Sequence, residues 1–467
     1  MSFQIIGEHN TATVHTEQSR EESEDLAIEQ VQEMVDHEAF YGDSDIEIQP
    51  DWHFGAGAVI GFTMPVKDCI VPNTVGVDVG CGVLSSKFGR LFDYEDEETL
   101  EELDQEVRSR VPTGYHVHSG NDYHIVNDTP WAEIKRKYRE FDNNTDFDLD
   151  DPDSVYHDDY ITELCNRGGY DTTKAINSVG SLGSGNHFVE FSTDPDDNIW
   201  CTIHTGSRGL GASVASYWQN KATSKTTMRV SIDDVDSDVR KYMNDDWKPK
   251  KEKIREDFDG EAIQGMFDKV SQAIQEHGPA NADRNTDLDY LEGSEAHGYI
   301  RDMVFLQTYA SESRKKIMRA VEDAMDAVVY DAELNSSPKR YETIESVHNY
   351  IDFEDGVIRK GACRAHEDER VLIPINMKYG TIIATGRGNE DWNNSAPHGA
   401  GRRMSRTKAK DMFDDSDFDE QTSGVFMSKQ PLDEIPGSYK SPDAIRDAVG
   451  ESVDIDCVIE PFMSIKG

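Results

Sequence analysis

The apolar positions along the chain predict a mixture of helices and short strands, with no internal repeat and no heptads. The longest expected helix runs from Glu295 to Val328, because apolar side chains recur there at spacings of three, four and seven residues. These side chains are Tyr299, Met303, Leu306, Ala310 and Ile317. A second helical stretch, Glu21 to His37, lies within the polar N-terminal region, residues 1–49. Its expected apolar face is formed by Leu26, Ile28, Val31 and Val35.

Glycine-rich segments with short apolar runs predict strands joined by tight turns. They cover residues 50–90, 175–215 and 339–390, and the last includes Val371–Pro374 and Thr381–Ala384 as strand candidates. Because these segments lie far apart in the sequence, they can share a site only by converging within one structure. We therefore expect a single intertwined domain of mixed helices and sheets.

Charged segments interrupt this pattern in three places. Residues 141–159 are acidic and rich in turn formers, which is typical of a linker or a surface insertion. Leu100 to Val107 predicts an acidic surface helix, and residues 231–275 predict a charged helical region. None of these segments carries a motif, so the expected domain extends over residues 1–467.

The net charge changes the picture of the surface. The chain of 467 residues has 92 acidic and 47 basic residues, a formal charge of −45. This balance argues against a general electrostatic nucleic-acid binder and against an anionic membrane as partner. Acidic excess spread over the whole chain is typical of a halophile surface, where salt screens long-range repulsion. A basic groove then needs to exist only locally.

The cysteines and the N-terminal residues predict the cellular compartment. The six cysteines have no framework spacing, so we expect reduced thiols and a cytoplasmic location. We expect no signal peptide and no transmembrane helix, because the N-terminus lacks a basic region followed by an apolar stretch and no run approaches 18 apolar residues.

Five scattered residues could bind metal. Asp78 and Cys81 lie in VGVDVGCGV, His187 in SLGSGNHFVE, His204 in CTIHTGSRG and His348 in VHNYI. Thiolate, carboxylate and imidazole suit borderline-soft divalent metals, and a thiolate can bridge two ions. Taken singly, a Cys or His between apolar residues is more often a packed core residue. Four of the five share glycine-dense segments, where backbone turns sharply or approaches a ligand.

The segment NNSAPHGAGRRMSR, residues 393–406, could bind phosphate. His398 precedes Gly399, Ala400 and Gly401, whose small side chains let backbone N–H groups approach an anion. The arginines that follow could hold phosphate bidentately, and a neutral imidazole can attack phosphorus. The alternative is a turn with solvated arginines.

In their order along the chain, these blocks resemble the RtcB-type RNA ligases. The matching blocks are PDWH with Gly55, Gly57 and Ile60-Gly61, then GVDVGCGV (76–83), SLGSGNHFVE (181–190), IHTGSRGLG (203–211), Ser294-Glu295-Ala296 with Tyr299, His348-Asn349, RKGA (359–362), HGAGR (398–402), IPGSYK (435–440) and IKG (465–467). The resemblance implies an α+β fold with a central metal-binding cleft. It also implies joining of an RNA 3′-phosphate or 2′,3′-cyclic phosphate to a 5′-hydroxyl, with GTP and two manganese ions.

The resemblance assigns roles residue by residue. Asp78, Cys81 and His187 would bind one ion, and Cys81, His204 and His348 the other. His398 would carry GMP after attack on GTP, oriented by Asp51. The remaining nucleotide contacts would come from Asn186, Phe188, Glu190, Asn376, Thr381, Gly399, Ala400, Gly401, Arg402, Tyr439 and Lys466. RNA phosphate would be held by Arg208, Lys360 and Arg406.

One departure concerns the nucleotide pocket. Family members usually have a GSMGTAS-like segment where this chain has INMKYGT, residues 375–381, so Asn376 and Thr381 replace small hydroxyl positions. The chain therefore resembles a divergent member acting in tRNA splicing or RNA repair on tRNA halves or broken RNA. An archease-type activator is a partner that some members use. Two alternatives are a metal-dependent enzyme that caps RNA 3′ ends or cleaves phosphodiesters, and an inactive RNA- or nucleotide-binding module.

Overall fold

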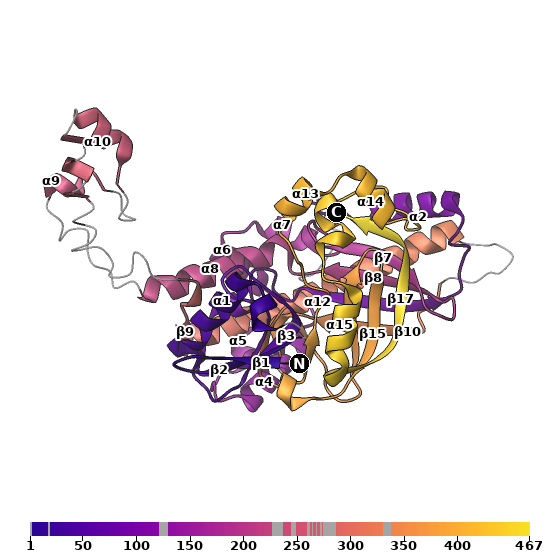
Figure 1. Cartoon of the computed structure of the whole chain (residues 1–467), viewed down its shortest axis with the longest axis horizontal. Helices are drawn as coiled ribbons and strands as arrows, with labels where there is room; N and C mark the ends of the chain where they lie inside the picture. The colour runs from indigo at the N-terminus through magenta and orange to yellow at the C-terminus, as the bar shows by residue number, and fades with distance from the viewer. Residues whose placement is uncertain are drawn as a thin grey trace.

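Two sheets packed among helices make up most of the protein (Figure 1). The computed structural model describes residues 2–16, 19–120, 129–226, 237–243, 249–258, 286–329 and 338–467, with short stretches between 262 and 273. Helices and strands are interspersed along the whole chain, so the expected α+β class is confirmed. No helix in the described part of the chain is long and apolar enough to cross a membrane.

The larger sheet has seven strands and carries most of the candidate metal ligands at one end. Its order is β10 (Glu342–Val347), β6 (Gly82–Gly89), β8 (Ile199–Thr205), β7 (Phe188–Thr193), β17 (Val453–Lys466), β15 (Gly380–Gly386) and β14 (Arg370–Asn376). Gly82 pairs with Thr205 on one side and with Val347 on the other. Phe188 pairs with both His204 and Lys466. This register brings the ends of five strands together, although they are up to 384 residues apart.

The smaller sheet supplies the carboxylate Asp51. Its six strands are β1 (Ser2–Ile6), β2 (Thr11–His15), β3 (Ile46–His53), β4 (Ile60–Pro65), β12 (Val357–Lys360) and β11 (Asn349–Ile351). Two short pairs complete the sheets: β13 (Ala362–Arg364) with β16 (Ser395–Pro397), and β5 (Cys69–Ile70) with β9 (Leu291–Glu292). Because β16 ends at Pro397, it delivers His398 to the region between the sheets.

The long helix α12 (Gly293–Val329) confirms the prediction for residues 295–328. All five of its predicted apolar positions are buried: Tyr299, Met303, Leu306, Ala310 and Ile317. It contacts α2 (Glu97–Arg110), α4 (Trp131–Asn144), α8 (Arg208–Thr226) and strands of both sheets. Further helices are α5 (Pro152–Val155), α6 (Tyr160–Gly168), α7 (Thr172–Ser178), α13 (Arg406–Met412), α14 (Asp415–Gln421) and α15 (Pro442–Ala448).

The N-terminal region differs from its prediction in detail. Helix α1 is shorter than the predicted stretch, Asp25–Val35, and Val31 and Val35 are buried as expected. Leu26 is 54% exposed, so its placement on the apolar face was wrong. The buried stripe consists of Ala27, Gln30, Val31, Met34 and Val35, one position further round the helix. Strands β1 and β2, also within residues 1–49, were not predicted.

The acidic segment 141–159 is partly helical and anchored in the core. Its carboxylates alternate with buried side chains, namely Phe141, Phe147, Leu149, Val155 and Tyr156. These side chains belong to the same apolar cluster as α12. Leu100, Leu103 and Val107 on α2 are buried in the same way beneath an acidic outer face.

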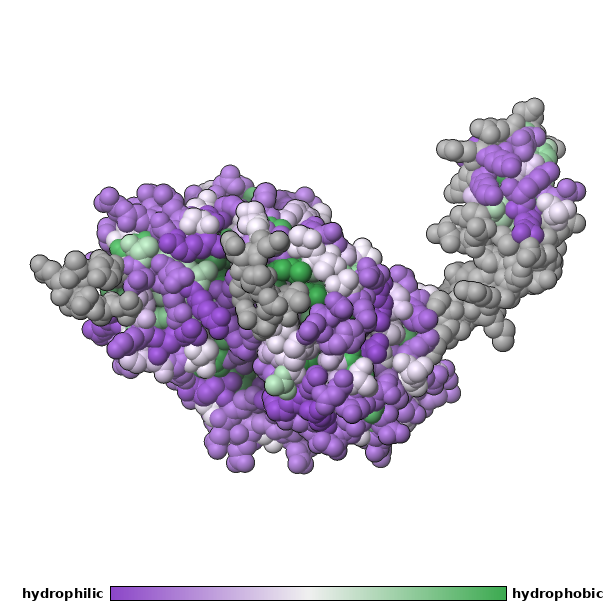
Figure 2. Space-filling model, turned by 180° about the vertical axis from the view of Figure 1, so that it is seen from behind, coloured by the Kyte–Doolittle hydropathy of each residue, from purple (hydrophilic) through white to green (hydrophobic). Residues whose placement is uncertain are grey.

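Two short helices lie apart from the sheets in Figure 1, α9 (Ser237–Arg240) and α10 (Lys251–Asp257). They share a small apolar cluster of their own that includes Tyr242, Met243 and Ile254. The predicted helical region 231–275 is thus helical in part: residues 241–243, 249–250 and 258 lie outside helices, and the remaining positions lie outside the described residues. Hydrophilic residues dominate the face of the molecule in Figure 2, in keeping with the acidic composition.

Candidate active site

Strand ends bring the five predicted metal ligands together. Cys81 immediately precedes β6, His204 is near the end of β8, and His348 follows β10. Asp78 joins them through a tight turn in which the Cys81 N–H donates to the Asp78 carbonyl (3.1 Å). Gly80 makes this turn possible: its φ is +68°, and a Cβ there would lie 2.9 Å from the Cα of Gln307.

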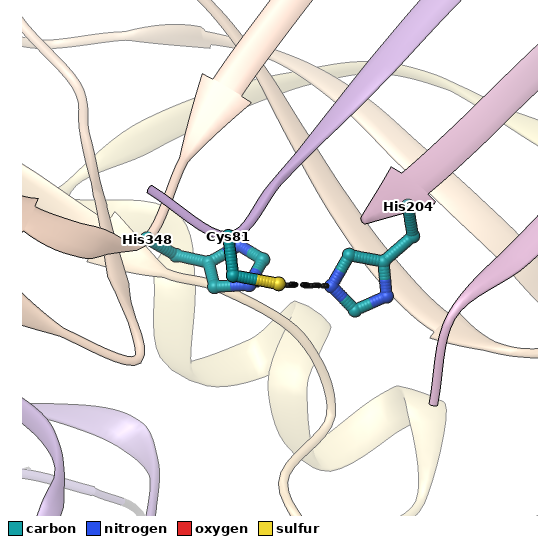
Figure 3. A group of neighbouring side chains, drawn as sticks. All are labelled: Cys81, His204 and His348. Atoms are coloured by element: carbon teal, nitrogen blue, oxygen red, sulfur yellow. Dashed lines mark hydrogen bonds between the residues drawn. The ribbon is translucent and has the colours of Figure 1, made fainter. Parts of the chain in front are cut away.

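Two overlapping sets of ligand atoms share the Cys81 thiol. The first is Cys81, His204 and His348, and the second is Asp78, Cys81 and His187; within each set all ligand atoms lie within 4.8 Å of one another. Cys81 Sγ is 3.3 Å from His204 Nε2, which in turn is 3.3 Å from His348 Nε2 (Figure 3). His187 Nε2 is 2.9 Å from Asp78 Oδ2 and 3.7 Å from the thiol.

Backbone carbonyls orient two of the imidazoles. His187 Nδ1 lies 3.0 Å from the Leu182 carbonyl, and His204 Nδ1 lies 3.1 Å from the Asn186 carbonyl. A carbonyl can only accept, so each Nδ1 donates, and Nε2 is the ring atom that a bound metal ion would use. A thiol, a carboxylate and three imidazoles held this way fit divalent transition metals.

Burial sets the protonation of the cluster. It lowers the pKa of His204 and His348 well below the usual value, so both rings are neutral at pH 7 and available as ligands. Burial and the Asp78 charge raise the pKa of the Cys81 thiol well above its usual value. Burial alone would also raise the pKa of Asp78, but the hydrogen bond from His187 outweighs it and the net shift is downward. A cation bound here would displace the thiol proton.

His398 lies directly beside this cluster. Its ring centroid is 4.9 Å from that of His348. Its Nδ1 is 2.6 Å from Oδ2 of Asp51, whose side chain is fully buried on β3. Gly401 allows the close approach of the two segments, because a Cβ there would lie 2.2 Å from the Asp51 carbonyl oxygen. With Nδ1 facing the carboxylate, Nε2 is the nitrogen left for chemistry.

A cavity of about 250 Å³ opens on the other side of His398. Its walls include the following predicted nucleotide contacts: Asn186, Phe188, Glu190, Asn376, His398, Gly399, Ala400, Gly401, Arg402, Tyr439 and Lys466. This volume lies just below the range of about 300–1,000 Å³ that is usual for small-molecule sites. His204 also lines it, so the cavity and the metal-ligand cluster adjoin.

Comparison with known proteins identifies the family. A family model described as tRNA-splicing ligase RtcB matches residues 30–246 and 259–467. The chain belongs to the RtcB family. Over 439 residues it is 28% identical to the RNA-splicing ligase RtcB of Escherichia coli (strain K12), covering 90% of each chain. It is 25% identical to the tRNA-splicing ligases RtcB of Nanoarchaeum equitans and Aeropyrum pernix, covering 85% of this chain and 82% of each relative. The resemblance seen in the sequence blocks is thereby confirmed.

One wall of the cavity contains a buried acidic residue and a buried basic residue. Glu190 and Lys466 lie at neighbouring positions on β7 and β17. Burial raises the pKa of Glu190 to about 7, and the nearby Lys466 and Ser464 offset this only in part. Burial lowers the pKa of Lys466, whose ammonium lies 4.8 Å from the centroid of the Phe188 ring. Together these groups form a polar edge beside an aromatic face.

Another part of the cavity wall contains two arginines that share one buried carboxylate. Glu434 is 2% exposed and lies 3.2 Å from Arg402 Nη1 and 3.1 Å from Arg406 Nη2. It also accepts a short hydrogen bond from the Tyr439 hydroxyl. The Arg402 guanidinium lies over the Tyr439 ring, 5.1 Å from its centroid. Both arginines are therefore held in place without a ligand.

Three predicted contacts do not line the cavity. Thr381 is fully buried within the sheet, and its hydroxyl has no hydrogen-bond partner among the described residues. Lys360 is 5% exposed, and its ammonium donates to the carbonyls of Ala56, Ala58 and Asn73 at 2.7–2.9 Å. All its protons are used there, so none is left for a phosphate. Arg208 lies at the start of α8, donating to Ser181 Oγ and the Gly114 carbonyl.

Sequence reasoning missed several cavity residues. Glu434 adjoins the IPGSYK block, and His53 closes the PDWH block, so both had a motif as a signal. Met377 and Ile375 lie in the divergent segment 375–381 and also line the cavity. They had no signal beyond hydrophobicity, which does not distinguish a cavity wall from a core position.

Proposed function

We propose that this protein is an RNA ligase that joins RNA 3′-phosphate or 2′,3′-cyclic phosphate ends to 5′-hydroxyl ends, using GTP. The observation that carries the proposal is the place of His398, which lies between the cavity and the ligand cluster with Nδ1 2.6 Å from Asp51 Oδ2. The RNA-splicing ligase names of the relatives support the same reaction class.

His398 is the nucleophile in this proposal. Nε2 attacks the α-phosphorus of GTP, a nitrogen–phosphorus bond forms, and the bond to the β-phosphate oxygen breaks to release pyrophosphate. The buried Asp51 carboxylate keeps Nδ1 protonated and stabilises the positive charge that develops on the ring. The RNA 3′-phosphate then takes GMP from His398, and attack by the 5′-hydroxyl expels GMP.

The ligand cluster would hold two manganese ions. Asp78, Cys81 and His187 would bind one, and Cys81, His204 and His348 the other, with the thiolate shared. When bound, the ions supply positive charge that neutralises phosphate oxygens during in-line transfer. Arg402 and Arg406 already face the cavity and would add positive charge around the same phosphates.

The guanine base would lie against Phe188 and Tyr439. Ionised Glu190 would accept hydrogen bonds from guanine N1–H and N2–H₂, which adenine lacks, so the cavity favours GTP over ATP. Asn376 lines the cavity but its Oδ1 already accepts from the backbone N–H groups of Lys378 and Tyr379. Its side-chain NH₂ is the part left for a base.

The test of this function uses labelled GTP and defined RNA ends. Protein is incubated with labelled GTP and manganese, and then with one RNA that has a 3′-phosphate and another that has a 5′-hydroxyl. We expect a joined strand and transient labelling of His398. A guanylated 3′ end that never joins would instead identify an RNA-capping enzyme, and absence of protein labelling would contradict the histidine intermediate.

The pKa of Glu190 predicts how GTP binding depends on pH. Because guanine recognition needs the carboxylate, a pKa of about 7 leaves roughly one tenth of the molecules competent at pH 6. We expect the dissociation constant for GTP to fall about tenfold between pH 6 and pH 8. Equilibrium binding without manganese measures this without the catalytic step.

The matched control is Glu190→Gln, which removes the titrating group and should bind GTP weakly at every pH. An unchanged pH dependence in that variant would assign the titration to another group.

The raised pKa of Glu190 also affects the stability of the fold. The stabilising contribution of protonated Glu190 is complete below the unfolded pKa near 4.5 and is lost as the pH rises through about 7.

The acidic surface predicts an unusual response to salt. At low salt, a chain of net charge −45 repels RNA and itself over a Debye length of about 10 Å at 0.1 M. We expect ligation to be poor near 0.1 M KCl and to improve toward molar KCl. Ligation rates across about 0.1 to 2 M KCl measure this. A steady fall over that range would show that ordinary counterion release dominates.

A further inference from the structure

A buried arginine on α12 connects the three strand ends that carry the Cys81, His204 and His348 ligands. Arg314 is fully buried. Its Nη1 donates to the carbonyl oxygens of Gly80 (2.7 Å) and Thr205 (2.8 Å), and its Nε donates to Glu345 Oε1 (2.8 Å). None of these groups contacts the nucleotide cavity, and the mechanism above does not use them.

Each partner of this guanidinium is close in sequence to a ligand. Gly80 precedes Cys81, Thr205 follows His204, and Glu345 lies on β10 three residues before His348. The three strands are neighbours, in the order β10, β6, β8. A single rigid group therefore contacts all three chain segments within a few residues of the point where each presents its ligand.

The packing around Arg314 leaves little freedom. A Cβ at Gly82 would lie 2.8 Å from the Ser346 carbonyl oxygen and 3.3 Å from Arg314 Cζ. The Ser311 hydroxyl, one turn before Arg314 on α12, donates to the other carboxylate oxygen of Glu345 (3.1 Å). Gln307, two turns before Arg314, packs against Gly80. One face of α12 thus supports both the turn before Cys81 and the ion pair beneath β10.

We propose that Arg314 is a positioning residue that fixes the spacing of Cys81, His204 and His348 and thereby the affinity of this set for a divalent metal. The proposal rests on the metal site of the proposed function. It assigns Arg314 no contact with metal or substrate, because the guanidinium acts through the backbone of Gly80 and Thr205 and through Glu345.

The geometry of the guanidinium explains why arginine is needed. It is planar and presents separate N–H groups in fixed directions, so it can bind two carbonyls and a carboxylate at once. A lysine ammonium keeps the charge but is a single point and cannot reach all three partners. Groups that orient metal ligands are worth about 10- to 100-fold in metal affinity, which sets the expected effect.

Cobalt(II) titration of the full-length protein tests the proposal. A thiolate–cobalt absorption band reports binding at Cys81 without any catalytic turnover. We expect Arg314→Gln and Arg314→Lys each to weaken cobalt binding about 10- to 100-fold. We expect Glu345→Gln, which keeps the shape and removes one charge, to weaken it less.

Arg359 provides the matched control. It is also fully buried and ion-paired, with Asp352 (3.1 Å) and Asp355 (2.6 Å), but none of its hydrogen bonds reaches the backbone next to a metal ligand. Arg359→Lys should therefore lose stability, measured by thermal unfolding, while binding cobalt within about threefold of wild type. Arg314→Lys serves as the test variant where Arg314→Gln does not fold.

The outcomes separate this proposal from the one it rests on. Cobalt affinity in folded Arg314 variants within threefold of wild type would overturn the positioning role, as would an equal loss in Arg359→Lys. No thiolate–cobalt band in the wild-type protein would overturn the metal site itself, and the positioning role with it.

Discussion

Replacing His398 with alanine is expected to abolish covalent labelling by GTP while leaving the fold intact. The side chain is on a turn, partly exposed beside the cavity, so its removal leaves no cavity in a core. Loss of a nucleophile typically costs on the order of 10⁴-fold or more in rate. The measurement is acid-labile, base-stable incorporation of labelled GMP, together with thermal unfolding of the variant. Labelling that persists in His398→Ala would place the nucleophile elsewhere.

Asp51→Asn is the companion variant. It preserves the size of a fully buried side chain but replaces the carboxylate that faces His398 Nδ1. An amide can stabilise the wrong tautomer, and in a comparable triad this change costs about 10⁴-fold. We expect labelling to fall by at least about 10²-fold. If Asp51→Asn unfolds at the same temperature as wild type, the loss of labelling is catalytic. Labelling equal to that of wild type would show that Asp51 has no part in the mechanism.

Cys81→Ala is expected to lose more bound manganese than His187→Ala. The thiol belongs to both ligand sets, whereas His187 belongs to one. Removing a shared ligand weakens both ions, so we expect bound metal after dialysis to fall from about two ions to near none in Cys81→Ala, and to about one in His187→Ala. Elemental analysis of dialysed protein makes the comparison.

Two controls sharpen that result. Cys201 is a buried cysteine in the core, outside both ligand sets, so Cys201→Ala should retain metal. Treatment with an oxidant should inactivate wild-type protein through the Cys81 sulfur. Equal metal loss in Cys81→Ala and His187→Ala would argue against a shared thiolate.

The sequence alone was sufficient to predict those site residues that lie within a local motif. Cys81, His187, His204, His348 and His398 each lie beside a glycine or at a strand end, and the structure brings them together. The α12 helix was equally predictable, because its apolar period persists over more than eight turns of one buried helix. Periodicity and motif are both local signals, and these features depend on little else.

Long-range contacts decided what the sequence could not reveal. The carbonyls that accept the hydrogen bonds of Lys360 come from Ala56, Ala58 and Asn73, which lie 287–304 positions earlier in the chain. The Thr381 side chain points to a buried face of the sheet because of the register of β15, and no neighbouring residue in the sequence predicts that face. Phe147 and Leu149 are buried although every second residue around them is acidic, since a strongly charged segment can still have one apolar face.

The position of β17 has a consequence for folding kinetics. This strand, Val453–Lys466, lies between β7 and β15, so the sheet is continuous only when residues about 270 positions apart have paired. Contacts of such large sequence separation must overcome loop-closure entropy before they stabilise anything, and they form late and slowly. Phe188, Glu190 and Lys466 meet across this same junction. The end of the cavity that Glu190 and Lys466 line therefore does not exist in any partly folded chain that lacks β17, and a ligand that binds there would report completion of the fold.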